Sequence, residues 1–170
     1  MGMESMEEES IDWSQIKVLL LDSDGVLTDG GVYLPELGGS EFRRFNIKDG
    51  FGITRLLSTG FPIAVISRSP STPVMVRCER LGIEHVYLGI ENKTSKAAEI
   101  LNELDLDWSD VAFMGDDVPD LELLNKVGFP FTPSDAAEEV RRHAIWASKF
   151  PGGGGAVREC CDRIYFSRSA

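Results

Sequence analysis

Short, uninterrupted apolar runs recur along this chain, and longer mixed segments separate them. Runs of this kind are typical of strands in a parallel sheet, where both faces are buried. The pattern predicts strands at residues 18–21, 63–66, 85–88, 111–114, 129–132 and 145–147. It predicts helices at 49–59, 72–82, 94–104, 121–127, 136–143 and 156–166. Strands that alternate with helices indicate a three-layer α/β fold with right-handed crossovers.

One segment does not follow this alternation of strands and helices. Residues 32–34 and 42–45 are predicted as the two arms of a β-hairpin that spans about 30–47. The predicted fold is therefore a Rossmann-like parallel sheet with helices on both faces and a protruding hairpin. A two-stranded ribbon is rarely stable alone, and the apolar residues of this one have little core of their own to pack on. These residues are Val32, Leu34, Phe42 and Phe45.

Composition places the chain among ordinary globular proteins. It has 170 residues, of which 42% are hydrophobic and 26% charged, so we expect one domain over residues 13–170 behind a flexible acidic tail over 1–12. The net charge of −11 argues against nucleic acid or an anionic membrane as a partner, because both require a cationic face. No apolar segment reaches 18 residues, so no membrane span is predicted.

The cysteines indicate a compartment. Cys78, Cys160 and Cys161 match neither a zinc-binding spacing nor a paired disulfide framework. A reducing compartment is the simplest interpretation, and we therefore expect the protein to be cytoplasmic.

Polar side chains follow successive predicted strands. Because the carboxyl ends of parallel strands share one edge of a sheet, these residues are expected to gather where ligands bind in such folds. They are Asp22 and Asp24 after the first strand, Ser67 and Arg68 after the second, Lys93 past the third, and Asp116, Asp117 and Asp120 after the fourth.

This set of residues is suited to phosphoryl transfer. Carboxylate oxygens without histidine or cysteine favour Mg²⁺ over zinc. A carboxylate can attack phosphorus and form an aspartyl-phosphate, while a second carboxylate two residues on moves the proton. Taken singly, Ser67 reads as a polar strand end and Lys93 as a solvated lysine at a helix start. The adjacent acids Asp116 and Asp117 have no packing purpose after an apolar strand.

The residues after these four strands, in this order along the chain, resemble the four sequence motifs of the haloacid dehalogenase-like phosphohydrolases. The resemblance implies that Asp22 is the nucleophile and Asp24 the general acid/base. It implies that Mg²⁺ is held by the Asp22 side chain, the Asp24 backbone carbonyl and Asp116. It further implies that Ser67 and Lys93 bind phosphate, and that Asp117 and Asp120 support Lys93 and the metal site.

The motif spacing leaves no room for a cap domain, because one hairpin and one helix fill the span from Asp24 to Ser67 and the span to Lys93 is shorter still. The segments 30–33, 45–50 and 152–159 are similar to those of the capless, tetrameric phosphatases of 3-deoxy-D-manno-octulosonate 8-phosphate (KDO 8-phosphate). This resemblance implies a small anionic phosphorylated sugar acid as substrate, in a biosynthetic route to surface glycans such as lipopolysaccharide. It also implies a homotetramer in which the hairpin closes a neighbouring site.

The sugar is less closely defined by the sequence. Arg68, together with Lys48, Asp49 and Gly50, is similar to the KDO 8-phosphate enzymes and is expected to bind substrate. Related phosphatases act on the 9-phosphates of the nonulosonates KDN and N-acetylneuraminate, and some fused relatives are catalytically silent oligomerisation modules. Both alternatives stay open, because the loop at Ser67-Arg68 is one glycine shorter than is usual and Gly154 stands where the family often has arginine.

Overall fold

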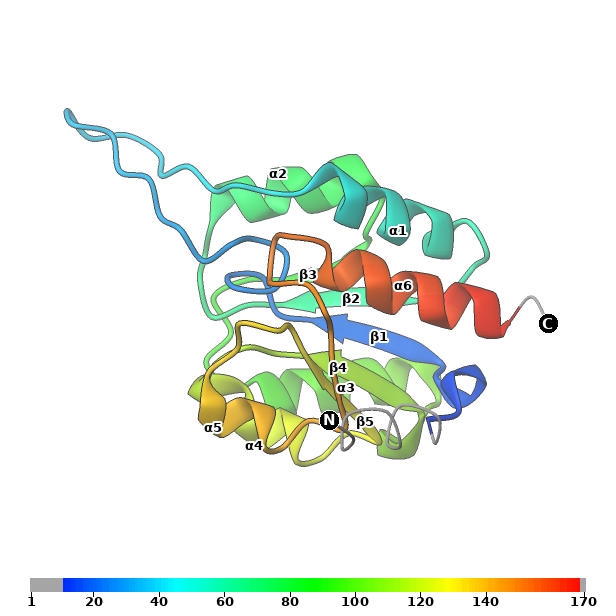
Figure 1. The fold of residues 1–170 in the computed structure, drawn as a ribbon. Coiled ribbons are helices and arrows are strands. Elements are labelled where there is room, and N and C mark those ends of the chain that lie inside the picture. Colours follow the sequence, from blue (N-terminus) through cyan, green and yellow to red (C-terminus); the bar gives the residue numbers. More distant parts are fainter. Residues whose placement is uncertain (1–10, 169–170) are drawn as a thin grey trace.

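Six parallel strands form one sheet in the order β3-β2-β1-β4-β5-β6. In the computed structural model, which describes residues 11–168, helices cover both faces of this sheet (Figure 1). The strands are β1 (Val18–Leu21), β2 (Ile63–Ile66), β3 (His85–Tyr87), β4 (Val111–Met114), β5 (Phe129–Thr132) and β6 (Trp146–Ala147). The helices are α1 (Ile47–Leu57), α2 (Thr72–Leu81), α3 (Lys93–Leu104), α4 (Leu121–Leu124), α5 (Glu138–Arg141) and α6 (Ala156–Ser167). The predicted fold class is confirmed.

The two helical layers follow from the alternation of side chains along each strand. Leu19 and Leu21 of β1 belong to the core cluster on the side of α1, α2 and α6. Val18 and Leu20 belong to the opposite cluster, with side chains of α3, α4 and α5. All four residues of β1 are fully buried, which is why the strand reads as a continuous apolar run.

The direction of strand succession reverses at β1. The chain moves from β1 to β2 and β3 on one side, then crosses back through α3 to β4 on the other. Leu21, the last residue of β1, lies opposite Val65 on one side and Met114 on the other. The loops that follow β1 and β4 therefore leave the sheet side by side, at the switch point where open α/β sheets bind ligands.

The hairpin protrudes from the carboxyl edge of the sheet (Figure 1). Its arms are not regular strands, because only isolated antiparallel bridges, Tyr33–Phe42 and Thr28–Phe45, join them among the described residues. Pro35 removes a backbone donor, and Gly38 and Gly39 have φ angles of +79° and +130° at the tip. No cap domain is inserted between β1 and β4 in the described chain, since apart from the sheet strands β2 and β3 this stretch holds the hairpin, α1, α2, α3 and a short 3₁₀ helix.

Three helix starts differ from the predicted ones, and the smallest difference is at α3, which begins one residue early, at Lys93. Helix α1 begins at Ile47 because Asn46 caps it by accepting a hydrogen bond from the Lys48 N–H, so the predicted start at residue 49 is wrong. Helix α5 begins only at Glu138, because the Ala137 N–H donates to the backbone oxygen of Asp116 at 2.9 Å. The second contact ties this helix to the loop after β4.

The N-terminal segment contributes to the folded domain from residue 11 onwards. Most of the predicted flexible tail, residues 1–10, lies outside the described residues. Ile11 packs against the core and Asp12 caps a short 3₁₀ helix, Trp13–Gln15, so these two residues of the predicted tail belong to the folded domain. Within residues 11–168, no helix is long and apolar enough to cross a membrane.

Candidate active site

Asp22 is the first residue beyond β1 and lies against the end of β4. Its N–H donates to the Met114 oxygen at 3.0 Å, which extends the β1–β4 pairing by one residue. Only 7% of Asp22 is exposed. The next residue, Ser23, places its Oγ 2.7 Å from Ser67 Oγ at the end of β2, so the loops of neighbouring strands are joined directly behind the carboxylate.

The turn after Asp22 requires glycine at position 25. Gly25 has a φ of +83°, a conformation that side chains disfavour, and a Cβ atom there would lie 1.9 Å from Asp116 Oδ2. The Thr28 hydroxyl accepts hydrogen bonds from the N–H groups of Gly25 and Gly30, each at 3.2 Å. Gly152 packs on the same turn, since a Cβ there would lie 1.8 Å from the Gly25 oxygen. The turn is thus held between β4 and the glycine-rich loop.

Lys93 brings a buried positive charge to Asp22. It is the first residue of α3, behind the capping residue Asn92, and its Nζ donates to Asp22 Oδ1 at 2.7 Å and to Asp120 Oδ1 at 2.6 Å. Burial alone would lower the pKa of Lys93, but the Asp22 and Asp120 carboxylates raise it above its ordinary value. The two carboxylates thus favour the charged form of Lys93 in this site.

Asp120 organises the loop after β4. Its second carboxylate oxygen accepts the N–H groups of Asp116 at 3.0 Å and Asp117 at 3.4 Å. Gly115 leaves room for it, because a Cβ atom at that position would lie 2.6 Å from Asp120 Cβ. The Asp117 side chain accepts the Val118 N–H at 2.8 Å, as the cap of a 3₁₀ turn. Asp120 is thus held on both oxygens by groups of the protein.

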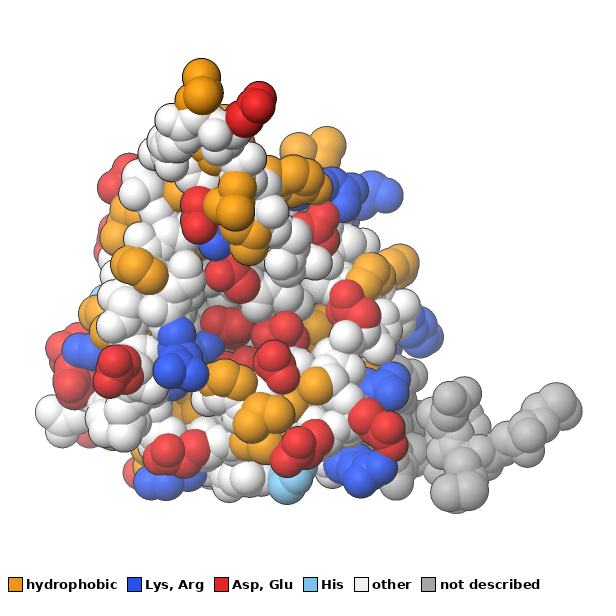
Figure 2. Space-filling view, turned by 90° about the vertical axis from the view of Figure 1, so that its left-hand side faces the viewer, with side chains coloured by type: hydrophobic (Ala, Val, Ile, Leu, Met, Phe, Trp, Pro, Cys, Tyr) orange, Lys and Arg blue, Asp and Glu red, His pale blue; other side chains and the backbone are white. Residues whose placement is uncertain are grey.

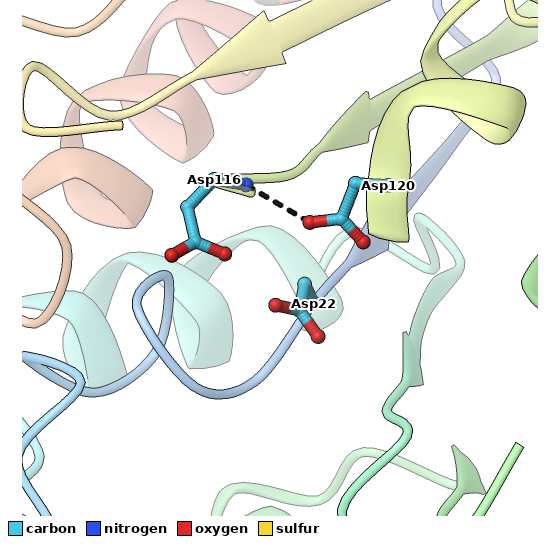
Figure 3. Close-up of side chains that lie close together, drawn as sticks. All are labelled: Asp22, Asp116 and Asp120. Carbon is cyan, nitrogen blue, oxygen red and sulfur yellow. Dashed lines mark hydrogen bonds between the residues drawn. The ribbon is translucent and has the colours of Figure 1, made fainter. Parts of the chain in front are cut away.

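Three carboxylates, those of Asp22, Asp116 and Asp120, converge at this site (Figure 3). One oxygen each from Asp22, Asp116 and Asp120 lies within 4.8 Å of the others. Burial, together with the Asp120 charge, raises the pKa of Asp22 to about 6 although Lys93 opposes the shift. Burial and the neighbouring Asp22 raise the pKa of Asp116 to about 8. Such repulsion between hard oxygen donors is what a bound Mg²⁺ relieves, so the residues fit this ion.

These residues line a pocket of about 340 Å³ at the carboxyl edge of the sheet. Figure 2 looks onto this edge and shows acidic side chains gathered in a hollow beneath the hairpin. Ser67 is buried in the wall, where its Oγ accepts the Ser69 N–H at 3.1 Å, and Arg68 is exposed at the rim. The structure brings eight predicted residues together around this pocket: Asp22, Asp24, Ser67, Arg68, Lys93, Asp116, Asp117 and Asp120.

The predicted substrate residues Lys48, Asp49 and Gly50 do not line this pocket within one subunit, and their role in substrate binding stays a prediction. Lys48 is exposed at a separate hollow formed with residues of α6. Asp49 is only 2% exposed and accepts the Arg158 N–H at 2.8 Å, so it caps the first turn of α6. Gly50 is buried against the Arg77 guanidinium.

Sequence reasoning missed a residue that contacts the pocket wall without lining the pocket. Arg43, at the base of the hairpin, donates through Nε to Asp24 Oδ1 at 3.0 Å. The available signal was a pair of arginines set between the aromatic residues Phe42 and Phe45, in a segment that we interpreted only as a hairpin arm.

Comparison with known proteins places the chain among phosphatases. It is 37% identical over 153 residues to the 3-deoxy-D-manno-octulosonate 8-phosphate phosphatase KdsC of Escherichia coli K12. The alignment covers 90% of this chain and 81% of that protein. The chain belongs to this family of phosphatases. Its members are phosphoric monoester hydrolases, and structural neighbours include a hydrolase of the haloacid dehalogenase-like superfamily from Legionella pneumophila. No family model matches the chain.

Solved structures agree with this assignment. A probable YrbI family phosphatase from Pseudomonas syringae is 41% identical, with a TM-score of 0.88 over 92% of this chain and 89% of that one. The KDO 8-phosphate phosphatase of Moraxella catarrhalis, solved with magnesium, phosphate and KDO, is 31% identical, with a TM-score of 0.89 over 95% and 92% of the two chains. The resemblance inferred from the motifs is confirmed.

Proposed function

We propose that this chain is a Mg²⁺-dependent phosphomonoesterase that hydrolyses KDO 8-phosphate to KDO and phosphate through an aspartyl-phosphate on Asp22. One observation carries the proposal. The Asp22 carboxylate is buried at the end of β1, 2.7 Å from the Lys93 ammonium and within the acidic cluster of a family whose relatives act on this substrate. Mg²⁺ held by Asp22, Asp116 and the Asp24 backbone carbonyl would supply positive charge that draws the phosphate towards these acids.

In the first step an oxygen of Asp22 attacks phosphorus, and the bond between phosphorus and the sugar oxygen breaks. Asp24 gives its proton to the departing alkoxide. Asp22 must be ionised to attack, and a pKa of about 6 leaves it mostly ionised above neutral pH. Lys93 donates to one Asp22 oxygen and so leaves the other oxygen for attack.

In the second step water attacks the phosphorus of the aspartyl-phosphate. Asp24, now a carboxylate, accepts the proton of that water, and the bond between Asp22 and phosphorus breaks to release phosphate and restore both acids. The charge on the phosphoryl oxygens is met by Lys93 and by the hydroxyl of Ser67. Ser67 Oγ also lies 2.7 Å from Ser23 Oγ, so the Ser67 proton reaches a phosphoryl oxygen when Ser23 is the donor in that pair.

The substrate's carboxylate requires a partner at the pocket mouth. Arg68 is exposed on the rim, and its planar guanidinium suits a carboxylate in a paired, charge-assisted contact. We therefore expect Arg68 to bind the carboxylate of the sugar acid, and its resemblance to the KDO 8-phosphate enzymes favours the eight-carbon acid. In that case Arg68→Ala raises KM far more than it lowers kcat, whereas Arg141→Ala, a change on the exposed side of α5, leaves both constants unchanged.

We propose further that the enzyme is a cytoplasmic homotetramer in which each hairpin closes a neighbouring site. Support comes from apolar side chains on the hairpin that the subunit does not bury, Leu34 at 72%, Leu37 at 98% and Phe42 at 63% exposure. Light scattering is expected to give four times the chain mass of 18.8 kDa. A species at the mass of one chain would contradict this part of the proposal.

The test of function compares phosphate release from KDO 8-phosphate and KDN 9-phosphate, each with Mg²⁺ and with EDTA. The proposal predicts a strong preference for KDO 8-phosphate that EDTA abolishes. A preference for the nine-carbon sugar would assign the chain to the nonulosonate phosphatases. No release from either, by a stable tetramer, would favour the silent oligomerisation module.

A further inference from the structure

The hairpin carries an arginine whose side chain is turned back into the molecule. Only 4% of the Arg43 side chain is exposed, although it belongs to a protruding segment. The adjacent Arg44 has a 63% exposed side chain and pairs with Asp29 at 3.1 Å. A buried guanidinium is favourable only where its donors are met by acceptors, so the placement of Arg43 calls for a specific partner.

Two carboxylates and a backbone oxygen meet its donors. Arg43 Nε lies 3.0 Å from Asp24 Oδ1, and its second terminal nitrogen lies 2.9 Å from Glu41 Oε2. The remaining terminal nitrogen donates to the Phe42 oxygen at 3.4 Å. The rigid fork of the guanidinium therefore holds Asp24 at a fixed distance from the hairpin.

The backbone around Arg43 is held on both sides. The bridge Tyr33–Phe42 precedes it, the bridge Thr28–Phe45 follows it, and the Phe45 side chain packs against the core. Asp24 in turn lies on the loop that Gly25 and Thr28 stiffen. Both partners of the ion pair thus stand on restrained backbone, which is the condition for one side chain to orient another.

We propose that Arg43 is a positioning residue for the reaction, which holds the Asp24 carboxylate in place for proton transfer to and from the sugar oxygen and water. The inference rests on the proposed function, because Asp24 has a proton to move only if the chain hydrolyses a phosphate ester. It gives the hairpin a role within its own subunit: the base of the hairpin sets the orientation of the general acid/base.

The consequence is a defect in turnover and not in binding. Arg43 does not line the pocket, so its loss is expected to leave the contacts to the phosphate and the sugar carboxylate intact. Proton transfer by a placed side chain contributes about 10²–10⁴-fold to a rate, and a carboxylate free to turn loses part of that factor. We expect Arg43→Gln to lower kcat at least about tenfold with KM within about twofold of wild type.

The test compares Arg43→Gln, Arg43→Lys and the matched control Arg44→Gln on KDO 8-phosphate with saturating Mg²⁺. Arg43→Lys keeps one charged donor and is expected to recover most of the lost kcat, and Arg44→Gln is expected to match wild type. The rate of phosphate release by wild type tests the proposed function, and the ratio of each variant's kcat to that of wild type tests the role of Arg43. Thermal unfolding and light scattering identify any variant that has lost its fold or assembly.

A double-mutant cycle separates positioning from a general structural effect. In the background of Asp24→Asn, the added change Arg43→Gln is expected to lower the residual kcat by less than about twofold, because there is no acid/base left to orient. Equal losses from Arg43→Gln in both backgrounds, a wild-type kcat for Arg43→Gln, or the same loss in Arg44→Gln would each overturn the proposal.

Discussion

The substitution Gly25→Ala tests how the turn after β1 places the acidic cluster. Gly25 has a φ of +83°, and a Cβ atom would overlap Asp116 Oδ2 at 1.9 Å. The left-handed backbone costs an alanine about 1–2 kcal/mol. Reduced freedom of the unfolded chain returns about 0.4–1 kcal/mol. The backbone alone therefore accounts for a net loss of about 1 kcal/mol in the free energy of unfolding.

The overlap adds a local effect to this loss. Ordinary contact between a Cβ atom and a neighbouring atom requires a separation above 3.4 Å. The Asp116 carboxylate must therefore move from its position beside Asp22 and Asp120 in the acidic cluster. Mg²⁺ demands near-ideal geometry from its ligands, and disturbing their support typically costs about 10–100-fold in metal affinity. We expect the Mg²⁺ concentration for half-maximal activity to rise about tenfold or more.

Gly60→Ala is the matched control. Gly60 has a φ of +80°, a Cβ atom there would meet no other group within 4 Å, and the residue precedes β2 at the opposite edge of the sheet. The substitution is expected to lower Tm by about 2–4 °C for a loss of about 1 kcal/mol, with an unchanged Mg²⁺ requirement. Urea unfolding and Mg²⁺ titration of activity measure the two effects. The reasoning is refuted if Gly25→Ala matches Gly60→Ala in both.

Three further predictions follow from the buried charges. Burial and repulsion between carboxylates raise the pKa of Asp22 to about 6 and that of Asp116 to about 8, so the folded state holds protons that the unfolded state releases. The free energy of unfolding in EDTA is therefore expected to fall as pH rises from about 4 to about 8. In urea unfolding, Asp116→Asn is expected to show a weaker dependence of this free energy on pH. Lys93→Met leaves Asp22 and Asp120 without their buried cation and is expected to lower the free energy of unfolding by about 3 kcal/mol at pH 8 in EDTA; an unchanged value would contradict the assigned contacts. Asp49→Ala removes a cap of α6 and is expected to cost about 1 kcal/mol in urea unfolding with KM unchanged, whereas a raised KM would restore a substrate role.

The sequence predicts the buried strands and the site residues that directly follow them, because both obey one rule of parallel sheets. The run Val18–Leu21 had to be a buried strand, and parallel strands bring the residues after them to one edge. That rule alone places Asp22, Lys93 and Asp116 together, because each follows a strand by a short loop.

The residues that the sequence does not place depend on contacts between distant segments. Asp49 was predicted at the start of a helix and as a substrate residue, and the fold adds a contact that the sequence does not show, since Asp49 caps α6, more than a hundred residues away in the chain. Arg43 reads as a surface arginine until the fold of the hairpin turns it onto Asp24. The hairpin itself lacks regular strands, because pattern predicts pairing but not whether a protruding ribbon has enough support to keep it.

The central claim is that Asp22 is the nucleophile of a Mg²⁺-dependent KDO 8-phosphate phosphatase. The most direct measurement is phosphate release from KDO 8-phosphate by wild type and by Asp22→Asn, with Mg²⁺ present and with thermal unfolding as the check on folding. Wild type is expected to turn over and the folded variant to be inactive, because an amide cannot form the aspartyl-phosphate. Substantial turnover by folded Asp22→Asn would contradict the account.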